Sequence, residues 1–354
     1  MRSRAWWGTT AVVLGGLLAT GCGGGDGDSA GGAPAGDSVA GGYPVTVTDC
    51  SGAETSFSEA PGKIVTSNAS SLELLLRLGA GDKVIGTGFP PGKGTLPAEL
   101  DAQAQRVEVM SRYVIPKEKL LGSGADVFLD TFGAMDMGGT ADVPTDEEFK
   151  AAGIKRVYLK STACAAGDDS PVTDLTAVQE DITSLGAVTG TSGRAKELVD
   201  GMKRKVAAVQ RAVGSTPEGE RPTYFFFDYD AGTKQPVVVC NRQIANAVIT
   251  LAGARNAFAD CDADFQQVGW EDVIAENPDW IQLGVRNRGS DAANDKAFDE
   301  ARKWLETNPA TKGLRAVEDG NFLRIGSERT TIAGVTNADT VQEIARKLYP
   351  GKVD

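Results

Sequence analysis

The sequence contains no histidine among its 354 residues, and this absence narrows the chemistry that it can perform. Without imidazole, the chain lacks the general base of Ser-His-Asp and Cys-His nucleophilic sites. Imidazole is also the commonest protein ligand of zinc, so a site that holds a bare metal ion is not expected. We therefore expect neither of these nucleophilic sites, and we expect any metal that the protein takes to arrive already chelated.

Positive charge is also scarce. The chain has 36 Lys and Arg against 48 Asp and Glu, which gives a formal net charge of −12 at pH 7. An acidic protein repels nucleic acid, and no basic patch interleaved with aromatic residues is present, so we predict no nucleic-acid partner. With 41% hydrophobic residues, the chain can bury the core of one large domain or two medium ones.

Residues 1–22 have the features of a targeting segment. Arg2 and Arg4 precede an apolar run at residues 6–19, which is too short to span a membrane as a mature anchor. Residues 18–22 (Leu-Ala-Thr-Gly-Cys) resemble a bacterial lipobox, after which Cys22 becomes the lipidated first residue. The alternative is an ordinary secretory signal with an accidental cysteine. Residues 23–42 are mostly Gly, Ala, Ser and Asp, a composition typical of a flexible tether. We predict an exported protein, lipid-anchored to the outer face of the cytoplasmic membrane.

The strongest helical pattern lies within residues 191–214. Its apolar residues recur at steps of three and four, which places them on one helix face: Ala195, Leu198, Val199, Met202, Val206, Val209 and Val213. Ser192 can cap the start, and Gly214 marks the stop. About 20 residues at roughly 1.5 Å each give a rod of about 30 Å, close to the width of a domain. An ordinary surface helix within one large domain is the alternative.

Short β-rich runs alternate with helical patterns on both sides of this helix, for example at residues 64–66, 84–89 and 127–130 before it and at 223–227 and 280–283 after it. Such alternation favours parallel sheets covered by helices on both faces. We predict an α/β protein with two Rossmann-like lobes, at residues 43–190 and 215–354, joined by a single long spine helix. The ligand cleft should lie between the lobes.

Export permits disulfides, and four cysteines follow Cys22, which allow three pairings. Cys50 and Cys164 precede the spine helix, whereas Cys240 and Cys261 follow it. Pairing within each lobe would leave the lobes free to move, so we prefer Cys50–Cys164 and Cys240–Cys261. Free, buried thiols are the alternative.

Four stretches carry a resemblance to a known family, at residues 64–86, 115–129, 251–260 and 267–281. They are similar to segments of the class III substrate-binding proteins that serve iron–siderophore and cobalamin ABC importers. The resemblance covers about residues 45–348, in the right order around the spine helix, although Ala125 stands where many members have proline. It implies a binding protein that is not an enzyme, that performs no covalent chemistry and that needs no cofactor.

Two acidic or glycine-rich patterns suggest ions or phosphates that we do not expect. Residues 86–94 resemble a phosphate loop, but the spacing is off by one and Gly94 replaces the hydroxyl that would hold Mg²⁺. Asp260, Asp262, Asp264 and Glu271 have the spacing of a calcium loop, but Phe265 occupies the position that needs glycine. We predict solvated acids, with calcium as the alternative, and the resemblance implies that Phe265 faces the cleft.

Glu118 and Glu271 lie in two of the matching stretches. The resemblance implies that each glutamate lies at the tip of one lobe and docks onto arginines of the importer's membrane subunits. The distance between two carboxylates on different lobes changes when the lobes close, and the membrane subunits could detect that change through charge-assisted hydrogen bonds. The alternative is that each glutamate only starts a helix, where it favours the helix dipole, and both roles can hold together.

Candidate ligand contacts lie in loops after predicted strands or at helix starts, the edge at which α/β folds bind ligands. Aromatic rings can stack on a flat ligand, and arginines can form ion pairs with anionic groups. Five arginines in such loops therefore favour an anionic ligand. The candidates are Ser67, Asn68, Phe89, Arg112, Tyr113, Phe132, Met135, Tyr229, Asn241, Arg242, Phe265, Arg286, Arg288 and Arg329.

These observations lead to one functional prediction. The chain is expected to be a monomeric, lipid-anchored solute-binding protein that captures a metal chelate, with a ferric siderophore as first ligand, and delivers it to an ABC permease. Cobalamin, haem or a deazaflavin precursor are alternatives, the last suggested by the early Asp-Cys at residues 49–50 and by Cys164. A rival from another class is an exported hydrolase that uses Asp228 and Asp230, which we expect to be solvated.

Overall fold

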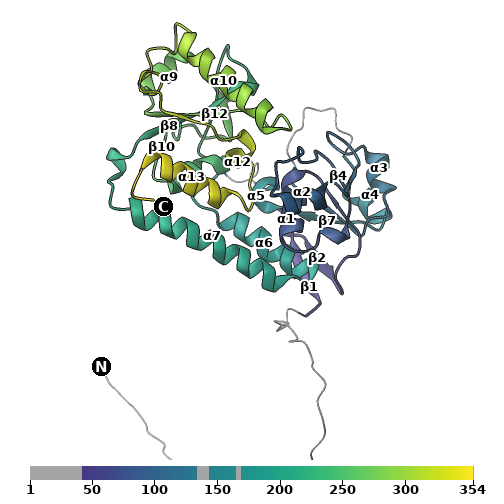
Figure 1. The fold of residues 1–354 in the computed structure, drawn as a ribbon. Coiled ribbons are helices and arrows are strands. Elements are labelled where there is room, and N and C mark those ends of the chain that lie inside the picture. Colours follow the sequence, from purple (N-terminus) through teal and green to yellow (C-terminus); the bar gives the residue numbers. More distant parts are fainter. Residues whose placement is uncertain (1–41, 134–142, 165–168, 354) are drawn as a thin grey trace, which may run out of the picture. The chain divides into compact units, whose positions relative to one another are not determined.

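A computed structural model describes residues 42–133, 143–164 and 169–353 (Figure 1). In the first lobe, five parallel strands form a sheet in the order β5-β4-β3-β6-β7. Every residue of β3 and β6 is buried, as expected for short apolar runs covered on both faces. The strands are β3 (Ile64–Thr66), β4 (Val84–Thr87), β5 (Glu108–Val109), β6 (Val127–Asp130) and β7 (Lys155–Tyr158).

Helices follow the strands of the first lobe and return the chain to the next strand. After β3, the Asn68 side chain accepts a hydrogen bond from the Ser71 amide and so begins the first helix. An antiparallel hairpin of β1 (Val45–Thr48) and β2 (Glu54–Phe57) precedes the sheet. The helices are α1 (Ala69–Arg77), α2 (Ala98–Ala104), α3 (Lys117–Leu121), α4 (Asp146–Ala151), α5 (Lys160–Ala163) and α6 (Thr176–Thr189), with a 3-10 turn at η1 (Gly81–Lys83).

The second lobe holds a parallel sheet in the order β10-β8-β12-β13 and a separate antiparallel pair, β9 with β11. Its strands are β8 (Thr223–Asp228), β9 (Val237–Val239), β10 (Arg255–Asn256), β11 (Phe265–Gln267), β12 (Trp280–Gly284) and β13 (Phe322–Leu323). Its helices are α8 (Ile244–Leu251), α9 (Trp270–Glu276), α10 (Asp291–Thr307), α11 (Arg315–Glu318), α12 (Ser327–Thr331) and α13 (Asn337–Leu348), with 3-10 turns at η3 (Glu218–Glu220) and η4 (Tyr229–Ala231).

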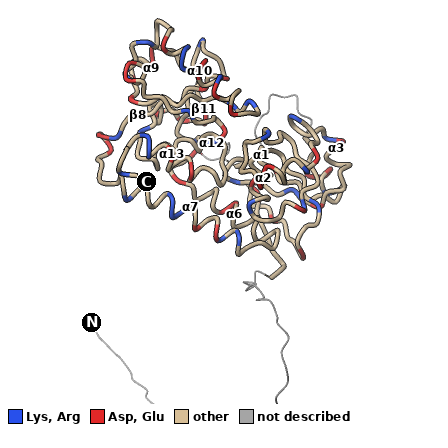
Figure 2. Tube along the Cα trace, in the orientation of Figure 1, with Lys and Arg blue, Asp and Glu red and all other residues tan. Residues whose placement is uncertain are grey.

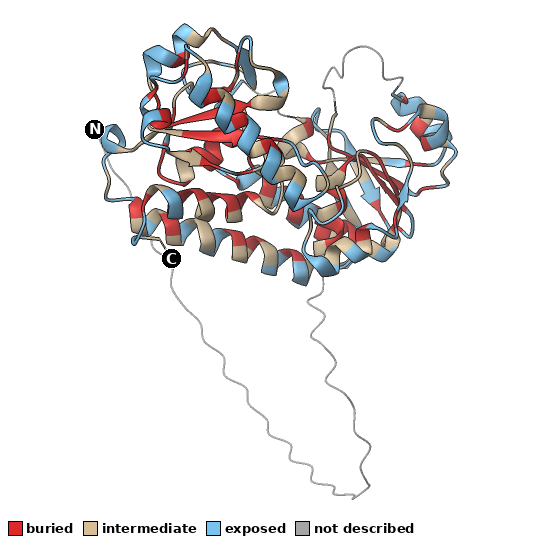
Figure 3. Cartoon of the chain, turned by 45° about the horizontal axis from the view of Figure 1, so that its top comes forward, coloured by how far each residue is buried: buried red, intermediate tan, exposed pale blue. Residues whose placement is uncertain are grey.

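The long helix α7 (Ser192–Val213) connects the two lobes. Its 22 residues make a rod of about 33 Å. The predicted apolar face is confirmed, because α7 packs against α6 and α13 through this stripe (Figure 3). The predicted start is wrong: Ser192 is the first helical residue, Thr191 is the N-cap, and neither supplies a side-chain capping bond. The predicted stop at Gly214 is confirmed.

One hydrophobic core runs from the first lobe through α7 to α13, and includes Leu72, Val209 and Ile344. A second core, around Phe225 and Leu283, lies within the second lobe. The predicted arrangement of two α/β lobes joined by a long helix is therefore confirmed, while its exact lobe boundaries stay a prediction.

Disulfides join Cys50 to Cys164 and Cys240 to Cys261, which is the within-lobe pairing that we preferred. Within the described ranges, every helix is too short or too polar to cross a membrane. The predicted signal peptide, the tether up to residue 41 and the lipidated Cys22 lie outside the described residues.

Candidate ligand-binding site

The carboxyl ends of four neighbouring strands of the first-lobe sheet carry predicted site residues. Ser67 follows β3, Phe89 follows β4, Tyr113 follows β5 and Phe132 follows β6. Because parallel strands end at the same edge of a sheet, these residues gather there although 65 positions separate the first from the last. Open α/β sheets bind their ligands at this edge.

Three of these side chains form an aromatic group that we call the aromatic trio: Phe89, Tyr113 and Phe132. The ring centroid of Phe89 lies 6.1 Å from that of Tyr113 and 5.5 Å from that of Phe132, and both pairs meet edge to face. Tyr113 is 73% exposed, so the trio reaches the surface. Phe89 holds a φ of +33°, a conformation that residues other than glycine seldom adopt and that is enriched at functional sites.

Ser67 and Asn68 lie beneath this edge and are buried. The Ser67 hydroxyl accepts a hydrogen bond from the Thr131 amide at 2.9 Å and forms a second hydrogen bond with the Thr131 hydroxyl. The side-chain oxygen of Asn68 accepts from the Ser71 amide at 3.0 Å and from the Ser71 hydroxyl at 3.1 Å. The Ser67 hydroxyl and the Asn68 side-chain oxygen are therefore engaged within the protein, where they hold the β3–α1 and β6 loops in place.

A pocket of about 40 Å³ opens beside the trio, and its lining comes from the first lobe alone. Most of its walls are apolar, with Ser67 and Asp130 as the polar exceptions. The lining residues are Ser67, Val114, Ile115, Leu120, Phe128, Asp130, Phe132, Gly133, Val143 and Pro144. This edge can therefore take an apolar or aromatic surface of a ligand.

The corresponding edge of the second lobe carries ion pairs. Asp228 and Asp230 follow β8, and Arg286 and Arg288 follow β12. Arg286 lies 3.7 Å from the Asp228 carboxylate, and Arg288 pairs with Asp230. Burial raises the pKa of Asp228, although Arg286 opposes that shift. Our expectation that the two aspartates are solvated is wrong, because neighbouring strands bring an arginine to each. Both carboxylates of the hydrolase alternative are therefore held in ion pairs.

Two further candidate arginines are also paired. Arg242 contacts Asp169 at 2.6 Å and Asp262 at 3.0 Å, and its hydrogen bond lowers the pKa of Asp262 despite partial desolvation. Arg329 lies 2.6 Å from Glu343. Arg112, by contrast, is exposed and has no acidic partner among the residues that the structure describes. The positive charge available to a ligand is therefore smaller than the number of loop arginines suggested.

The remaining candidates are distributed over the second lobe. The Tyr229 ring packs edge to face on Phe227 at 6.0 Å. The side-chain oxygen of Asn241 is buried without a hydrogen-bond partner, and its backbone carbonyl accepts from the Val172 amide. Phe265 begins β11 opposite Val239 and is 43% exposed. Met135 lies outside the described residues.

Segments near the carboxyl edges of the two lobes contact each other, and two of these contacts lie close to the predicted site. A Cβ placed on Gly92, in the loop after β4, would lie 3.3 Å from the Asn287 side-chain oxygen, after β12. The Ser70 hydroxyl in α1 donates to the Ala333 carbonyl at 2.8 Å. The first-lobe trio and the second-lobe ion pairs thus belong to edges that meet each other.

Glu118 and Glu271 are each exposed and each occupy the second position of a helix, α3 and α9. The helix-start role is therefore confirmed, and the docking role stays a prediction. No group of three acidic or sulfur ligands within the described ranges could hold a metal ion, and this includes the acids of the calcium-like spacing. Figure 2 shows acidic and basic residues interspersed along the chain.

Sequence reasoning missed the residues that support the trio. The Asp130 carboxylate accepts from the Phe132 amide at 2.8 Å and the Gly133 amide at 3.1 Å, and it pairs with Arg156. An aspartate that ends an apolar strand was the available signal. Its partner lies on the next strand, and only the strand order shows that the two meet.

The chain thus has two α/β lobes, one long connecting helix, and predicted site residues gathered at sheet edges that contact each other. A family model described as periplasmic binding protein matches residues 64–328, and the chain belongs to this family, whose members are transport binding proteins and not enzymes.

Individual similarities support this membership. The chain is 24% identical over 314 residues to an uncharacterised ABC transporter substrate-binding lipoprotein, YvrC of Bacillus subtilis, covering 87% of this chain and 86% of that one. It is 23% identical over 291 residues to a cobalamin-binding protein of Halobacterium salinarum, covering 80% and 69%. The structure of an ABC-type Fe³⁺-hydroxamate transport system from Saccharomonospora viridis superposes with a TM-score of 0.69 at 22% identity, over 87% of this chain and 99% of that chain.

Proposed function

We propose that this chain is the lipid-anchored substrate-binding protein of an ABC importer and that it captures a metal chelate, with a ferric siderophore as the first candidate. The observation that carries this proposal is the aromatic trio together with Arg112, which has no acidic partner among the described residues, at the carboxyl edge of the first-lobe sheet. Aromatic rings can contact the apolar organic shell of a chelate, and a guanidinium can form ion pairs with its anionic groups.

The similarities order the candidate ligands. The neighbour from Saccharomonospora belongs to an Fe³⁺-hydroxamate system, which agrees with a ferric hydroxamate as first ligand. The relative from Halobacterium binds cobalamin, which makes cobalamin the second candidate. Haem and a deazaflavin precursor share the flat conjugated surface that the trio could contact. Since the second-lobe arginines are paired with acids, we expect contacts with the ligand's apolar surface to contribute more to affinity than charge.

The anchoring part of the proposal rests on the lipobox-like residues 18–22 and the tether that follows. The Bacillus relative is itself a lipoprotein, which supports the same arrangement here. An anchored binding protein stays close to its permease, which raises the effective concentration of the loaded form at the membrane.

A direct binding experiment tests the ligand class. The full chain in detergent is dialysed against a ferric trihydroxamate, a ferric triscatecholate, haemin and cyanocobalamin, each followed by its own absorbance. We expect saturable binding of one of them with a Kd below about 1 µM, near −8 kcal/mol. If none accumulates with the protein, the metal-chelate assignment fails.

Docking onto the permease is tested by uptake. Glu118→Ala with Glu271→Ala should lower transport of the bound chelate into cells at least about tenfold while its affinity for the isolated protein stays the same. Glu147→Ala with Glu276→Ala is the matched control, because both are exposed helical glutamates outside the predicted docking positions. Undiminished uptake by the first variant would reject docking through these two carboxylates.

A further inference from the structure

Phe132 contributes the ring that closes the aromatic trio, and its position depends on a short loop. Asp130 forms the base of this loop, since its carboxylate accepts from the Phe132 and Gly133 amides and pairs with Arg156. Asp130 is 2% exposed, so its place is fixed within the sheet. The other side of the loop needs a second support.

Helix α5 provides that second support. Gly133 has a φ of +54°, and a Cβ placed on it would lie 2.5 Å from the Ala163 carbonyl oxygen and 2.8 Å from the Ala163 Cβ. The loop therefore lies directly against the last residue of α5 with no room for a side chain. A displacement of Ala163 would therefore move the surface against which Gly133, the residue after Phe132, packs.

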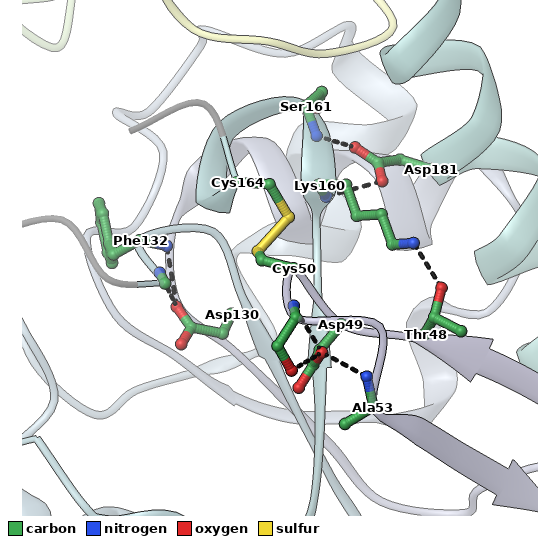
Figure 4. The surroundings of a disulfide bond; sticks show 12 residues. Thr48, Asp49, Cys50, Ala53, Asp130, Phe132, Lys160, Ser161, Cys164 and Asp181 are labelled. Atoms are coloured by element: carbon green, nitrogen blue, oxygen red, sulfur yellow. Dashed lines mark hydrogen bonds between the residues drawn. A yellow bond between two sulfur atoms is a disulfide. The ribbon is translucent and has the colours of Figure 1, made fainter. Parts of the chain in front are cut away.

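A four-residue helix does not hold its own conformation in water, so α5 needs support at both ends. At its start, the buried Asp181 carboxylate accepts from the Lys160 amide at 2.8 Å and the Ser161 amide at 2.9 Å. At its end, Cys164 is joined to Cys50 (Figure 4). The disulfide is therefore the covalent support next to Ala163.

The other half of this crosslink is itself rigid. Cys50 lies in the turn of the β1–β2 hairpin, where the Asp49 carboxylate accepts from the Ser51 amide at 2.8 Å and the Ala53 amide at 2.9 Å. The Lys160 ammonium also donates to the Thr48 hydroxyl, so hairpin and α5 are joined twice. Figure 4 shows Phe132 and Asp130 on one side of the disulfide and Lys160 and Asp181 on the other.

We propose that the Cys50–Cys164 disulfide is a positioning element of the ligand site: through α5 and Gly133 it holds Phe132 against Phe89. This inference rests on the proposed function in so far as the trio contacts the ligand. The Cys240–Cys261 disulfide supplies a matched control, because it lies in the second lobe and packs in that lobe's core.

Hydrogen exchange tests the positioning without any ligand. The full chain in detergent is compared with Cys50→Ser/Cys164→Ser and with Cys240→Ser/Cys261→Ser, and mass spectrometry follows the peptide over residues 129–133. We expect the Phe132 and Gly133 amides to exchange at least about tenfold faster in the first variant and at the wild-type rate in the second. Equal rates in all three proteins would overturn the proposal.

A purely structural role is separated by two further readouts. Loss of global stability would accelerate the slowest amides of the whole first lobe together, so local acceleration at Phe132 and Gly133 alone is required. If the double variant does not fold, a phosphine reductant applied to the folded protein replaces it, because Cys50 is exposed while Cys240 is buried. Alkylation and mass spectrometry identify the opened disulfide, and unchanged exchange after its opening would reject the proposal.

Binding then connects position to function. A chelate that binds the wild-type protein should bind the Cys50→Ser/Cys164→Ser variant about three- to tenfold more weakly, and the control variant with unchanged affinity. If no chelate binds the wild-type protein, the proposed function fails while the exchange result still decides the positioning role. Unchanged affinity together with faster exchange would show that Phe132 is not a ligand contact and would overturn the proposal as stated.

Discussion

The two sheet edges that meet in this protein use opposite chemistry. The first-lobe edge presents three aromatic rings and the guanidinium of Arg112, for which residues 42–133, 143–164 and 169–353 supply no acidic partner. The second-lobe edge presents Arg286 and Arg288, but each is matched by an aspartate from the neighbouring strand. One edge is thus free to contact a ligand, whereas the charges of the other already satisfy one another.

The comparison also shows which arginines of a predicted site are available to bind a ligand. An arginine in a loop after a strand is available to a ligand only if no acid from an adjacent strand reaches it. Asp228 precedes Arg286 by 58 positions, yet parallel pairing of β8 with β12 brings the two together. The expectation of an anionic ligand therefore depends on Arg112 alone among the candidate arginines.

The largest expected difference between the lobes concerns stability. Arg156→Ala leaves the carboxylate of Asp130, whose side chain is 3% exposed, without its charged partner. Breaking a buried pair on one side costs about 3 kcal/mol or more. Arg286→Ala removes a guanidinium that is 58% exposed and lies 3.7 Å from the buried Asp228, so water weakens this pair more and we expect a smaller loss. Urea unfolding of both variants measures the difference, and equal losses would contradict the comparison.

A second comparison concerns pH. Burial raises the pKa of Asp181 to about 6 from 3.8, although hydrogen bonds from Ser161 and Lys160 oppose the shift. Because the folded state binds the proton more tightly than the unfolded state, this residue stabilises the fold most below pH 4, and the stability falls as pH rises towards 6. The shift corresponds to about 3 kcal/mol.

The Asp181→Asn variant should not lose this stability as the pH rises. The unfolding free energy of the wild-type protein minus that of the variant should therefore decrease by up to about 3 kcal/mol across that window. Asp228→Asn in the second lobe should show a smaller change of the same sign, because Arg286 opposes the rise of the Asp228 pKa. Urea unfolding at pH 4 and pH 6.5 measures both. A wild-type protein whose stability relative to Asp181→Asn is constant with pH would contradict the assignment.

The aromatic rings should differ next. Phe132→Ala should weaken binding of the captured chelate about tenfold, because an aromatic contact contributes about 0.5–1.5 kcal/mol beyond the area it buries. Tyr229→Ala on the second lobe should weaken binding less than about threefold, because the Tyr229 ring packs against Phe227. Calorimetric titration measures both affinities. A greater loss for Tyr229→Ala would place the main contact on the second lobe.

The smallest expected difference concerns the arginines. Arg112→Gln should weaken binding of an anionic chelate about threefold in low salt and hardly at all in 1 M salt, where exposed charges are screened. Arg286→Gln should change the affinity less than about twofold, since Asp228 already neutralises Arg286. If Arg286→Gln has the larger effect, the second-lobe ion pairs open when the ligand binds.

The fold could be predicted largely from local patterns. The long helix follows from apolar residues at steps of three and four, and strands such as β6 follow from short apolar runs. The three residues of β3 were predicted from their apolar run. Strands β5 and β10, of two residues each, were missed because Glu-Val and Arg-Asn form neither an apolar run nor a period. They are defined by pairing with a neighbouring strand, which is a property of the folded chain.

The site was predictable only in part. Phe89, Tyr113 and Phe132 could be named one by one because each follows a strand. Their meeting depends on the strand order β5-β4-β3-β6, which no local pattern contains. Asn68 caps α1 through its side-chain oxygen, the role that an asparagine before a helix usually takes, and its contact with a ligand stays a prediction. Long-range ion pairs could not be predicted either, because they depend on which strands become neighbours in the folded chain.

The single helix between the lobes limits how far they can move. A rotation of about 5° about one end of α7 displaces a point at the far end by about 3 Å, given a length of about 33 Å. That displacement is the length of one hydrogen bond. We therefore expect loaded and empty protein to scatter X-rays almost identically, so a permease would have to recognise occupancy as a change in alignment comparable to gaining or losing a single contact.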